Sequence, residues 1–237
     1  ADFDSDGDLD VYVAASVGSK LLINDDGTLR VENTNSYSLP SRVRTVAWVD
    51  YDNDGAMDLY AWPAGLFRQT SAGEFEETGL LRMPSHYWAL VDPRVLWFDY
   101  DNDGDRDFLL MQRFFPQVIQ KSFPNAMPFS VDFLINEADR GKNWIQVDLL
   151  GPAGNREAIG STVTLHTTTD IEVQEVGQFD SSHYSQGHYR LYFSVANNVS
   201  VDRLEVRWPD QSVQQFLQPE TGRLIRIEKR PPIDAIE

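Results

Sequence analysis

The sequence predicts an all-β protein in which a partial β-propeller of about three blades precedes a β-sandwich-like C-terminal domain. A nine-residue acidic pattern, Asp-x-Asp-x-Asp-Gly-x-x-Asp, occurs three times, over residues 2–10, 50–58 and 99–107. Short runs rich in β-branched and aromatic residues flank the copies, as expected for strands. From Asn143 onward, about seven short strand-like segments are separated by turn signals at the spacing typical of a β-sandwich.

The spacing of the acidic pattern indicates the propeller. Its copies begin at Asp2, Asp50 and Asp99, so the period is 48 and then 49 residues. Periods of this length are typical of propeller blades, each built from four strands. We therefore expect a repeat domain and a C-terminal β domain, with these bounds: a propeller-repeat domain over residues 1–140, containing units at about 1–38, 41–84 and 93–138, and a β domain over 141–230.

The predicted units are unequal. We expect all four strands in the second unit, whereas the first lacks the strand ahead of its acidic loop. A segment from Pro116 to Pro128 interrupts the third. Three blades are too few to close a propeller, and an open end exposes unpaired strand edges. We therefore predict that these edges pair in a homodimer, or that the C-terminal region closes the open end as a further sheet.

Each acidic loop has the donor pattern of a calcium site. Ca²⁺ takes six to eight oxygen ligands, and carboxylates at alternate positions wrap them around one point. The glycine at the sixth position permits a tight bend, after which the seventh residue offers its backbone carbonyl. We predict about three Ca²⁺ ions, each bound by five residues, of which the fourth binds through its backbone carbonyl. The three sets are Asp2, Asp4, Asp6, Asp8 and Asp10; Asp50, Asp52, Asp54, Ala56 and Asp58; and Asp99, Asp101, Asp103, Asp105 and Asp107.

The EF-hand is the main alternative for this pattern. Its twelve-residue loop lies between two helices and ends in a bidentate Glu. Position 12 is Val13, Ala61 and Leu110 in the three loops, and none of these side chains can bind a metal. A second alternative is that the loops are solvated acidic turns without a metal. That interpretation leaves the threefold repetition at a nearly constant period unexplained.

Composition and charge exclude several classes of function. The chain has 237 residues, a formal net charge of −17 and no cysteine. Clustered Lys and Arg are absent, so we expect no nucleic-acid partner, and no thiolate or disulfide chemistry is available. No apolar run is long enough to span a membrane. Because carboxylate-rich modules suit millimolar Ca²⁺, we expect an extracellular, periplasmic or cell-surface location.

The repeated loops, together with the Leu-x-x-Asn segment after the first of them at Leu21–Asn24, resemble FG-GAP or VCBS-type repeats. The C-terminal region resembles the ASPIC/UnbV domain through several short motifs: Asn143-Trp144, Asn155-Arg156 with Ile159-Gly160, Glu172-Val173, Glu175-Val176-Gly177, Ser182-x-Tyr184-Ser185-Gln186 and the run from Val201 to Asp210. A His-Phe-Gly-Leu-Gly run typical of that family is missing, since residues 192–196 read Tyr-Phe-Ser-Val-Ala.

The combination resembles bacterial relatives of cartilage acidic protein. The resemblance implies an integrin-like propeller with Ca²⁺ in the loop between the first two strands of a blade. It also implies an extracellular, calcium-binding protein of adhesion or recognition. We expect a protein or a glycan as its ligand. It brings no defined reaction.

A calcium-dependent hydrolase of phosphoesters or glycans is the alternative function. In the segment Ser181–His188, His183 or His188 could act as a general base beside a serine. The sequence shows neither an orienting carboxylate nor a Gly-x-Ser-x-Gly elbow. We therefore predict no catalytic residue, interpret this segment as a surface or ligand-contact loop, and expect His86 and His166 to be structural.

Overall fold

The structure, a computed structural model, describes residues 1–4, 6–71, 73–83, 91–114, 129–137, 143–177 and 188–230. The prediction of an all-β protein is confirmed, because the described elements are seventeen strands and one 3₁₀ turn, η1 (Thr34–Tyr37). The chain divides into two compact units, one containing β1 to β10 and the other β11 to β17. The bounds of the predicted units and domains remain predictions.

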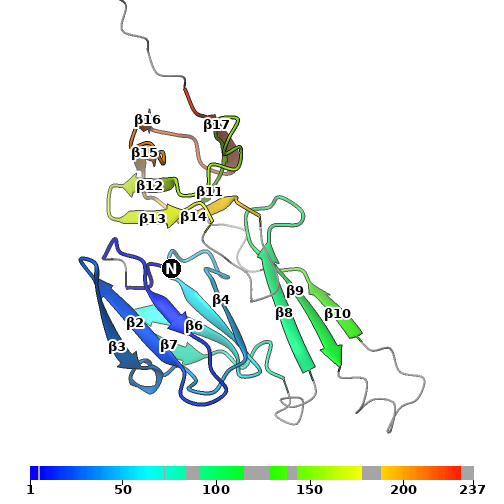
Figure 1. Cartoon of the computed structure of the whole chain (residues 1–237). Coiled ribbons are helices and arrows are strands. Elements are labelled where there is room, and N and C mark those ends of the chain that lie inside the picture. Colours follow the sequence, from blue (N-terminus) through cyan, green and yellow to red (C-terminus); the bar gives the residue numbers. More distant parts are fainter. Residues whose placement is uncertain are drawn as a thin grey trace, which may run out of the picture. The chain divides into compact units, whose positions relative to one another are not determined.

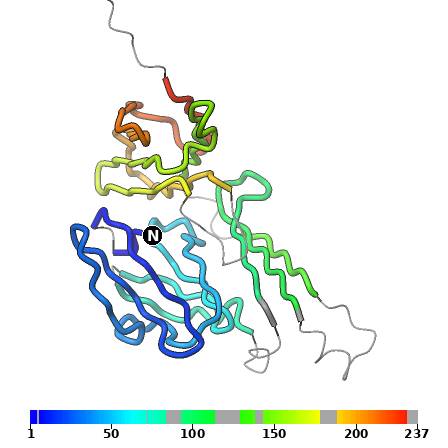
Figure 2. The backbone as a smooth tube through the Cα atoms, viewed as in Figure 1, coloured from blue at the N-terminus to red at the C-terminus, as the bar shows by residue number. Residues whose placement is uncertain are grey.

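The first unit contains three successive antiparallel sheets, which we call blades 1, 2 and 3 (Figure 1). Blade 1 is formed by β1 (Val11–Val13), β2 (Lys20–Asp25) and β3 (Thr28–Asn33). Blade 2 is formed by β4 (Thr45–Val49), β5 (Asp58–Trp62), β6 (Gly65–Ser71) and β7 (Glu74–Glu77). Blade 3 is formed by β8 (Val91–Phe98), β9 (Asp107–Phe114) and β10 (Phe129–Leu134). In each blade the strands pair in sequence order, as in a propeller, and the tube in Figure 2 follows these meanders.

The acidic loops show which strands of the three blades are equivalent to one another. β1, β5 and β9 each begin at or directly after the last Asp of a loop. Blade 2 therefore has the full set of four strands. In the described residues, blade 1 has no counterpart of β4, although Ala1 and Asp10 exchange backbone hydrogen bonds at the first rung of that pairing. The described part of blade 3 has no counterpart of β7.

Two apolar clusters lie between the blades. The first joins Tyr12, Leu21 and Ile23 of blade 1 to Leu59 and Phe67 of blade 2. The second brings together residues of blades 2 and 3 that are at most 3% exposed, including Tyr60, Trp62, Trp97, Phe108 and Leu110. Both faces of blade 2 are therefore buried, as alternating side chains of a central blade require.

The second unit is a pair of sheets around one core. One sheet has the order β14–β11–β17 and the other β13–β12–β15–β16. The strands are β11 (Asn143–Leu150), β12 (Thr162–Thr167), β13 (Ile171–Glu175), β14 (Leu191–Val195), β15 (Val201–Arg207), β16 (Val213–Leu217) and β17 (Arg223–Glu228). Their inward side chains form a single cluster that includes Ile145, Val163, Phe193 and Trp208. This arrangement agrees with the predicted sandwich, although β11 and β17 pair in parallel.

Candidate metal centres

The first Asp of each acidic loop folds the loop around itself. In the second loop, the Asp50 carboxylate accepts hydrogen bonds from the backbone N–H groups of Asp54 and Gly55, both at 3.1 Å. Asp2 and Asp99 accept the corresponding pair of bonds at 3.1 and 3.2 Å. The bend needs a left-handed residue, and the glycines supply it, with φ of +96°, +91° and +105° at Gly7, Gly55 and Gly104.

The last Asp of each loop ties the loop to the neighbouring strands of its own blade. The two oxygens of Asp58 accept bonds from the backbone N–H groups of Tyr51 (3.2 Å) and Gln69 (2.7 Å). Asp10 and Asp107 repeat both contacts, to Phe3 and Asn24 and to Tyr100 and Asn136. These carboxylates are 0–3% exposed, so they anchor each loop in the interior of its blade.

The loops bring predicted ligands together in triads. Carboxylate oxygens lie within 4.8 Å of one another in three sets, Asp2, Asp4 and Asp6; Asp50, Asp52 and Asp58; and Asp99, Asp101 and Asp107. Asp10, Asp54 and Asp103 lie outside these triads. The complete ligand sets, including the carbonyls of Asp8, Ala56 and Asp105, remain predictions.

The donor chemistry of the triads fits a hard divalent cation. Oxygen donors that converge on one point with excess negative charge are the ligands that Ca²⁺ and Mg²⁺ prefer. In the first triad, one carboxylate oxygen of Asp4 is buried and accepts no hydrogen bond among the described residues. A buried carboxylate oxygen without a donor is costly, and a bound cation would offset that cost.

Burial of the loop carboxylates opposes their ionisation in the metal-free protein. Desolvation, partly offset by the bond from Gln69, raises the pKa of Asp58 to about 8. Desolvation likewise raises the pKa of Asp2 to about 6, and desolvation followed by the proximity of Asp103 raises the pKa of Asp105 to about 8. Because a metal binds the ionised carboxylate, protons compete with it at Asp2 and Asp58 below these values.

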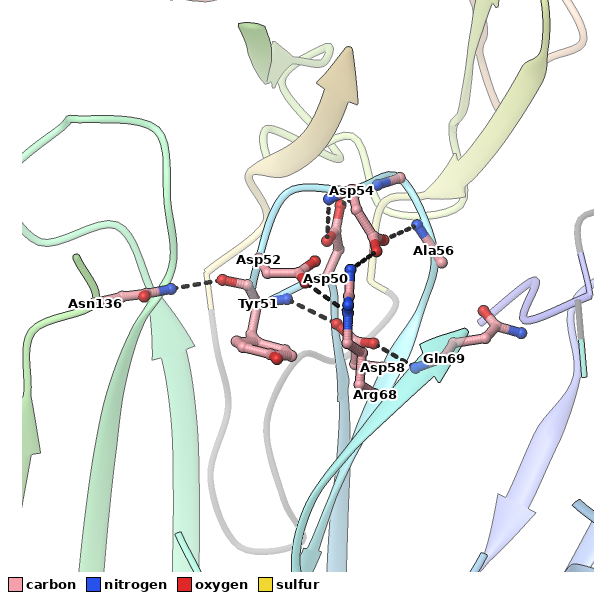
Figure 3. A network of polar contacts seen from close by, with 10 residues as sticks. Asp50, Tyr51, Asp52, Asp54, Ala56, Asp58, Arg68, Gln69 and Asn136 are labelled. Atoms are coloured by element: carbon pink, nitrogen blue, oxygen red, sulfur yellow. Dashed lines mark hydrogen bonds and ion pairs between the residues drawn. The ribbon is translucent and has the colours of Figure 1, made fainter. Parts of the chain in front are cut away.

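Arg68 distinguishes the second loop from the other two. Its guanidinium forms ion pairs with Asp52 (2.8 Å) and Asp54 (2.7 Å), and Figure 3 shows it directed into the loop. The side chain is 39% exposed, so solvent screens part of this attraction. The equivalent positions in blades 1 and 3, one residue before the paired Asn24 and Asn136, are Ile23 and Ile135. The guanidinium therefore pairs with two carboxylates that the sequence assigns to the metal.

We expect Arg68→Ile to strengthen metal binding at the second loop. Two unit charges at about 4 Å interact by about 4 kcal/mol at an effective dielectric constant of 20, and partial exposure reduces this to a fraction. A tenfold gain in affinity at one of the sites, measured by calorimetric titration with Ca²⁺, is the expected result. Arg82→Ile is the matched control, because Arg82 pairs with Glu77 outside the loop. Equal effects of both substitutions would contradict a role for Arg68 at the metal.

Two side-chain amides that the sequence interpretation did not assign link a blade to the blade before it. The Gln69 amide of blade 2 donates to the carbonyl of Phe3 in the first loop at 2.6 Å. The Asn136 amide of blade 3 donates to the carbonyl of Tyr51 in the second loop, also at 2.6 Å (Figure 3). Asn24 has the same place in blade 1, since all three backbone N–H groups bind the last Asp of their own loop. We call Asn24, Gln69 and Asn136 the junction amides.

The second and third acidic loops also contact each other directly. The Asn53 amide donates to the carbonyl of Gly104, and the Arg106 guanidinium donates to the carbonyl of Asp50, both at 3.3 Å. Arg106 is 4% exposed, which places this contact inside the protein. The second and third triads are thus held by a common set of hydrogen bonds.

In the C-terminal unit, the motif around Asn155 has a structural role. The Asn155 side chain donates to the carbonyl of Ile159 (2.9 Å) and accepts from its N–H group (3.1 Å), which closes a turn. A Cβ atom on Gly151 would lie 2.1 Å from the Asn155 carbonyl oxygen, so the turn needs glycine there. These residues fix the conformation of a loop.

Of the two histidines considered as a general base, only His188 belongs to the described residues, and it is exposed. His166 lies on β12, and its ring nitrogen is 3.1 Å from the Arg203 guanidinium. Burial, followed by the charge of Arg203, lowers the pKa of His166. His86 and the segment Ser181–Gly187, which includes His183, lie outside the described residues. None of the described helices has the length and apolarity to cross a membrane.

Comparison with known families identifies both regions. The model of the FG-GAP-like repeat family matches residues 2–61, which hold the first two acidic loops, the strands of blade 1, and β4 and most of β5 of blade 2. The model of the ASPIC and UnbV family matches residues 151–232, most of the C-terminal unit. No curated protein matched the chain. The chain therefore combines FG-GAP-like repeats with an ASPIC and UnbV domain, as its motifs predicted.

These domains are typical of extracellular recognition and adhesion modules, and they are usually not catalytic. The acidic triads add sites whose oxygens lie close enough to bind metal ions.

Proposed function

We propose that the chain is a calcium-binding recognition or adhesion module that acts outside the cell, in the periplasm or at the cell surface. About three Ca²⁺ ions have a structural role in it, and open blade edges favour a homodimer. The observation that carries this proposal is the threefold repetition of one acidic loop, in which three carboxylates converge within 4.8 Å each time.

The position of the loops supports a structural role for the metal. In each loop the last Asp binds backbone N–H groups on two sides, and the junction amides connect two of the loops to the following blade. A cation that neutralises the carboxylates removes their mutual repulsion and favours the folded state. The ligand of the module is proposed to be a protein or a glycan.

Calcium binding should be measured by equilibrium dialysis at pH 8, where fewer protons compete for Asp58. We expect about three Ca²⁺ per chain, with Mg²⁺ binding more weakly because it requires a tighter octahedral set of ligands. A stoichiometry below one ion per chain in protein first stripped with chelator contradicts the proposal.

The alternative is a hydrolase in which one loop leaves its Ca²⁺ open to substrate. The Arg68 guanidinium beside the second loop gives this alternative one specific feature, a positive charge next to a metal site. Generic phosphoester and glycoside substrates, tested with and without Ca²⁺, separate the two functions. Calcium-dependent turnover that Asp52→Asn abolishes would favour the hydrolase.

A further inference from the structure

We propose that blade 3 binds an extended segment of a partner protein, which adds to the outer edge of β10 as a fourth strand and places an aromatic side chain in a pocket between blades 2 and 3. This inference rests on the proposed function, because it chooses a protein over a glycan as the ligand of the module. The junction between blades 1 and 2, where blade 2 has all four strands, shows what such a strand contributes.

The outer edge of blade 3 is open in the part of the chain that the structure describes. In blade 2, β6 pairs with β5 on one side and with β7 on the other. β10 is the equivalent of β6, because Gln69 and Asn136 make the same bond to the last Asp of their loops. Among the described residues, β10 pairs with β9 alone. An unpaired edge of this kind can accept a further strand.

The backbone groups that such a strand would meet can be identified from blade 2. The Leu66 N–H group donates to the carbonyl of Leu80, and the Leu66 carbonyl accepts from Thr78, both at 3.0 Å, directly after β7. Phe133 has the place of Leu66, three residues before the junction amide. Alternate residues of an antiparallel strand direct their backbone groups to the same side. Phe133 and Val131 therefore present theirs to the open edge.

A mainly apolar pocket of about 270 Å³ lies between blades 2 and 3. Leu66, Trp97 and Phe108, which are at most 3% exposed, belong to its lining. Leu134 of β10 lines it as well and is 47% exposed. Phe67, which is the equivalent of Leu134 in blade 2, is 5% exposed. The pocket is therefore uncovered on the side of β10, where blade 2 is covered.

The equivalent space between blades 1 and 2 is filled by an aromatic residue of β7. Phe75 is 5% exposed, and its ring centroid lies 6.2 Å from those of Phe3 and Trp48. Tyr51 has the place of Phe3, one residue after the first Asp of its loop, and Trp97 has the place of Trp48, two residues before that Asp. Both line the pocket. The fourth strand of a blade thus supplies the ring that fills the junction.

The sequence provides no such ring at the corresponding position of blade 3. Phe75 is the sixth residue after Gln69, and the sixth residue after Asn136 is Lys142. The next residue begins β11, which pairs with β14 and β17 in the C-terminal unit. A separate segment must therefore supply both the fourth strand and its aromatic side chain.

The edge also indicates the chemistry of the added segment. In blade 2, Gln69 lies opposite Phe75. The same register places the aromatic residue of the added strand opposite Asn136 and a residue four positions later opposite Asp132. Asp132 is exposed, and the whole chain has a net charge of −17, so a basic residue there and no acidic residues elsewhere complement it. A glycan cannot continue a backbone ladder, and a protein segment can.

The probe is a synthetic peptide with the sequence Gly-Thr-Phe-Thr-Thr-Thr-Lys and a fluorophore at its C-terminus. It copies residues 73–79, which contain β7, with each Glu replaced by Thr and the last residue replaced by Lys. We expect saturable binding to the Ca²⁺-loaded chain by fluorescence anisotropy. Replacing the Phe of the peptide by Ala should raise the Kd at least about tenfold, because the pocket then stays unfilled.

Two substitutions in β10 locate the binding site. Leu134→Asp places a charge at the pocket and should raise the Kd at least about tenfold. Val131→Asp is the matched control, because Val131 is 54% exposed and its side chain points to the opposite face of the strand, so the Kd should change less than about twofold. Leu134→Trp, which fills the pocket from the chain itself without a buried charge, should also block the peptide. Thermal melts show that the variants are folded.

Hydrogen exchange distinguishes strand addition from binding in the pocket alone. The backbone amide of Phe133 should exchange at least about tenfold more slowly when the peptide is bound. Absence of saturable binding up to about 1 mM peptide, equal affinity of the Ala peptide, or unchanged exchange at Phe133 overturns the inference. A parent dimer that excludes the peptide also overturns it, because a second copy then occupies the edge. Calcium stoichiometry is measured on the same samples, and full Ca²⁺ binding without peptide binding overturns this inference alone.

Discussion

Removal of calcium is expected to lower the melting temperature of the first unit by about 20–30 °C, and added Ca²⁺ should restore it. A ligand present at 100 times its Kd contributes about 2.7 kcal/mol per site, so three sites contribute about 8 kcal/mol. For a unit of this size, 1 kcal/mol corresponds to roughly 3–4 °C. The structural reason is that the loop carboxylates converge, with Asp58, Asp107 and Asp10 buried beneath the loops.

The measurement is a thermal melt followed by near-ultraviolet circular dichroism, with EDTA and then with excess Ca²⁺. The C-terminal unit serves as an internal control, because none of the acidic triads among the described residues lies in it. Its transition should not move. An identical melt of the first unit in chelator and in Ca²⁺, in protein shown to be free of metal, would falsify a structural role for the ion.

Asp58→Asn is expected to cost about 4–6 kcal/mol in the presence of Ca²⁺. The Asp58 side chain is 0% exposed and accepts bonds from Tyr51 and Gln69 with its two oxygens. An amide has only one acceptor oxygen, so one buried N–H group loses its partner at about 1–3 kcal/mol. Weaker binding at the second site removes about 2.7 kcal/mol more.

The pH dependence of this variant gives a second readout. In the metal-free parent, the folded-state pKa of Asp58 is raised to about 8, so this group favours folding at low pH and loses that contribution as pH rises from about 4 to 8. Asparagine does not titrate, and the variant should lack this part of the slope. Asp26→Asn, an equal change of charge in the exposed turn between β2 and β3, is the control. Denaturant unfolding at pH 6 and pH 8 measures both effects.

Much of this architecture follows from local sequence rules. The glycine of each loop is required by a positive φ, and the strands beside the loops alternate between two buried faces, so pattern and period were sufficient to predict them. The seven strands of the C-terminal unit follow from the same alternation.

The contacts between blades could not be predicted from these local sequence rules. Gln69 binds a carbonyl 66 residues away and Asn136 binds one 85 residues away, and no local pattern encodes these partners. The Leu-x-x-Asn segment at Leu21–Asn24 contains one of the junction amides but does not indicate its role. Arg68 stands where the other blades have isoleucine, but its reach into the loop depends on the approach of β6 to Asp52 and Asp54. The parallel pairing of β11 with β17 joins strands from opposite ends of the unit, which alternation alone does not specify.

The junction amides make each blade an interchangeable module. A blade gives a hydrogen bond to its predecessor and offers a carbonyl to its successor, and both groups belong to segments that every copy contains. An in-frame duplication of one period, 48 or 49 residues, would therefore lengthen the array without new compensating substitutions. Proteins built from this part can thus evolve different blade numbers while their metal loops stay the same.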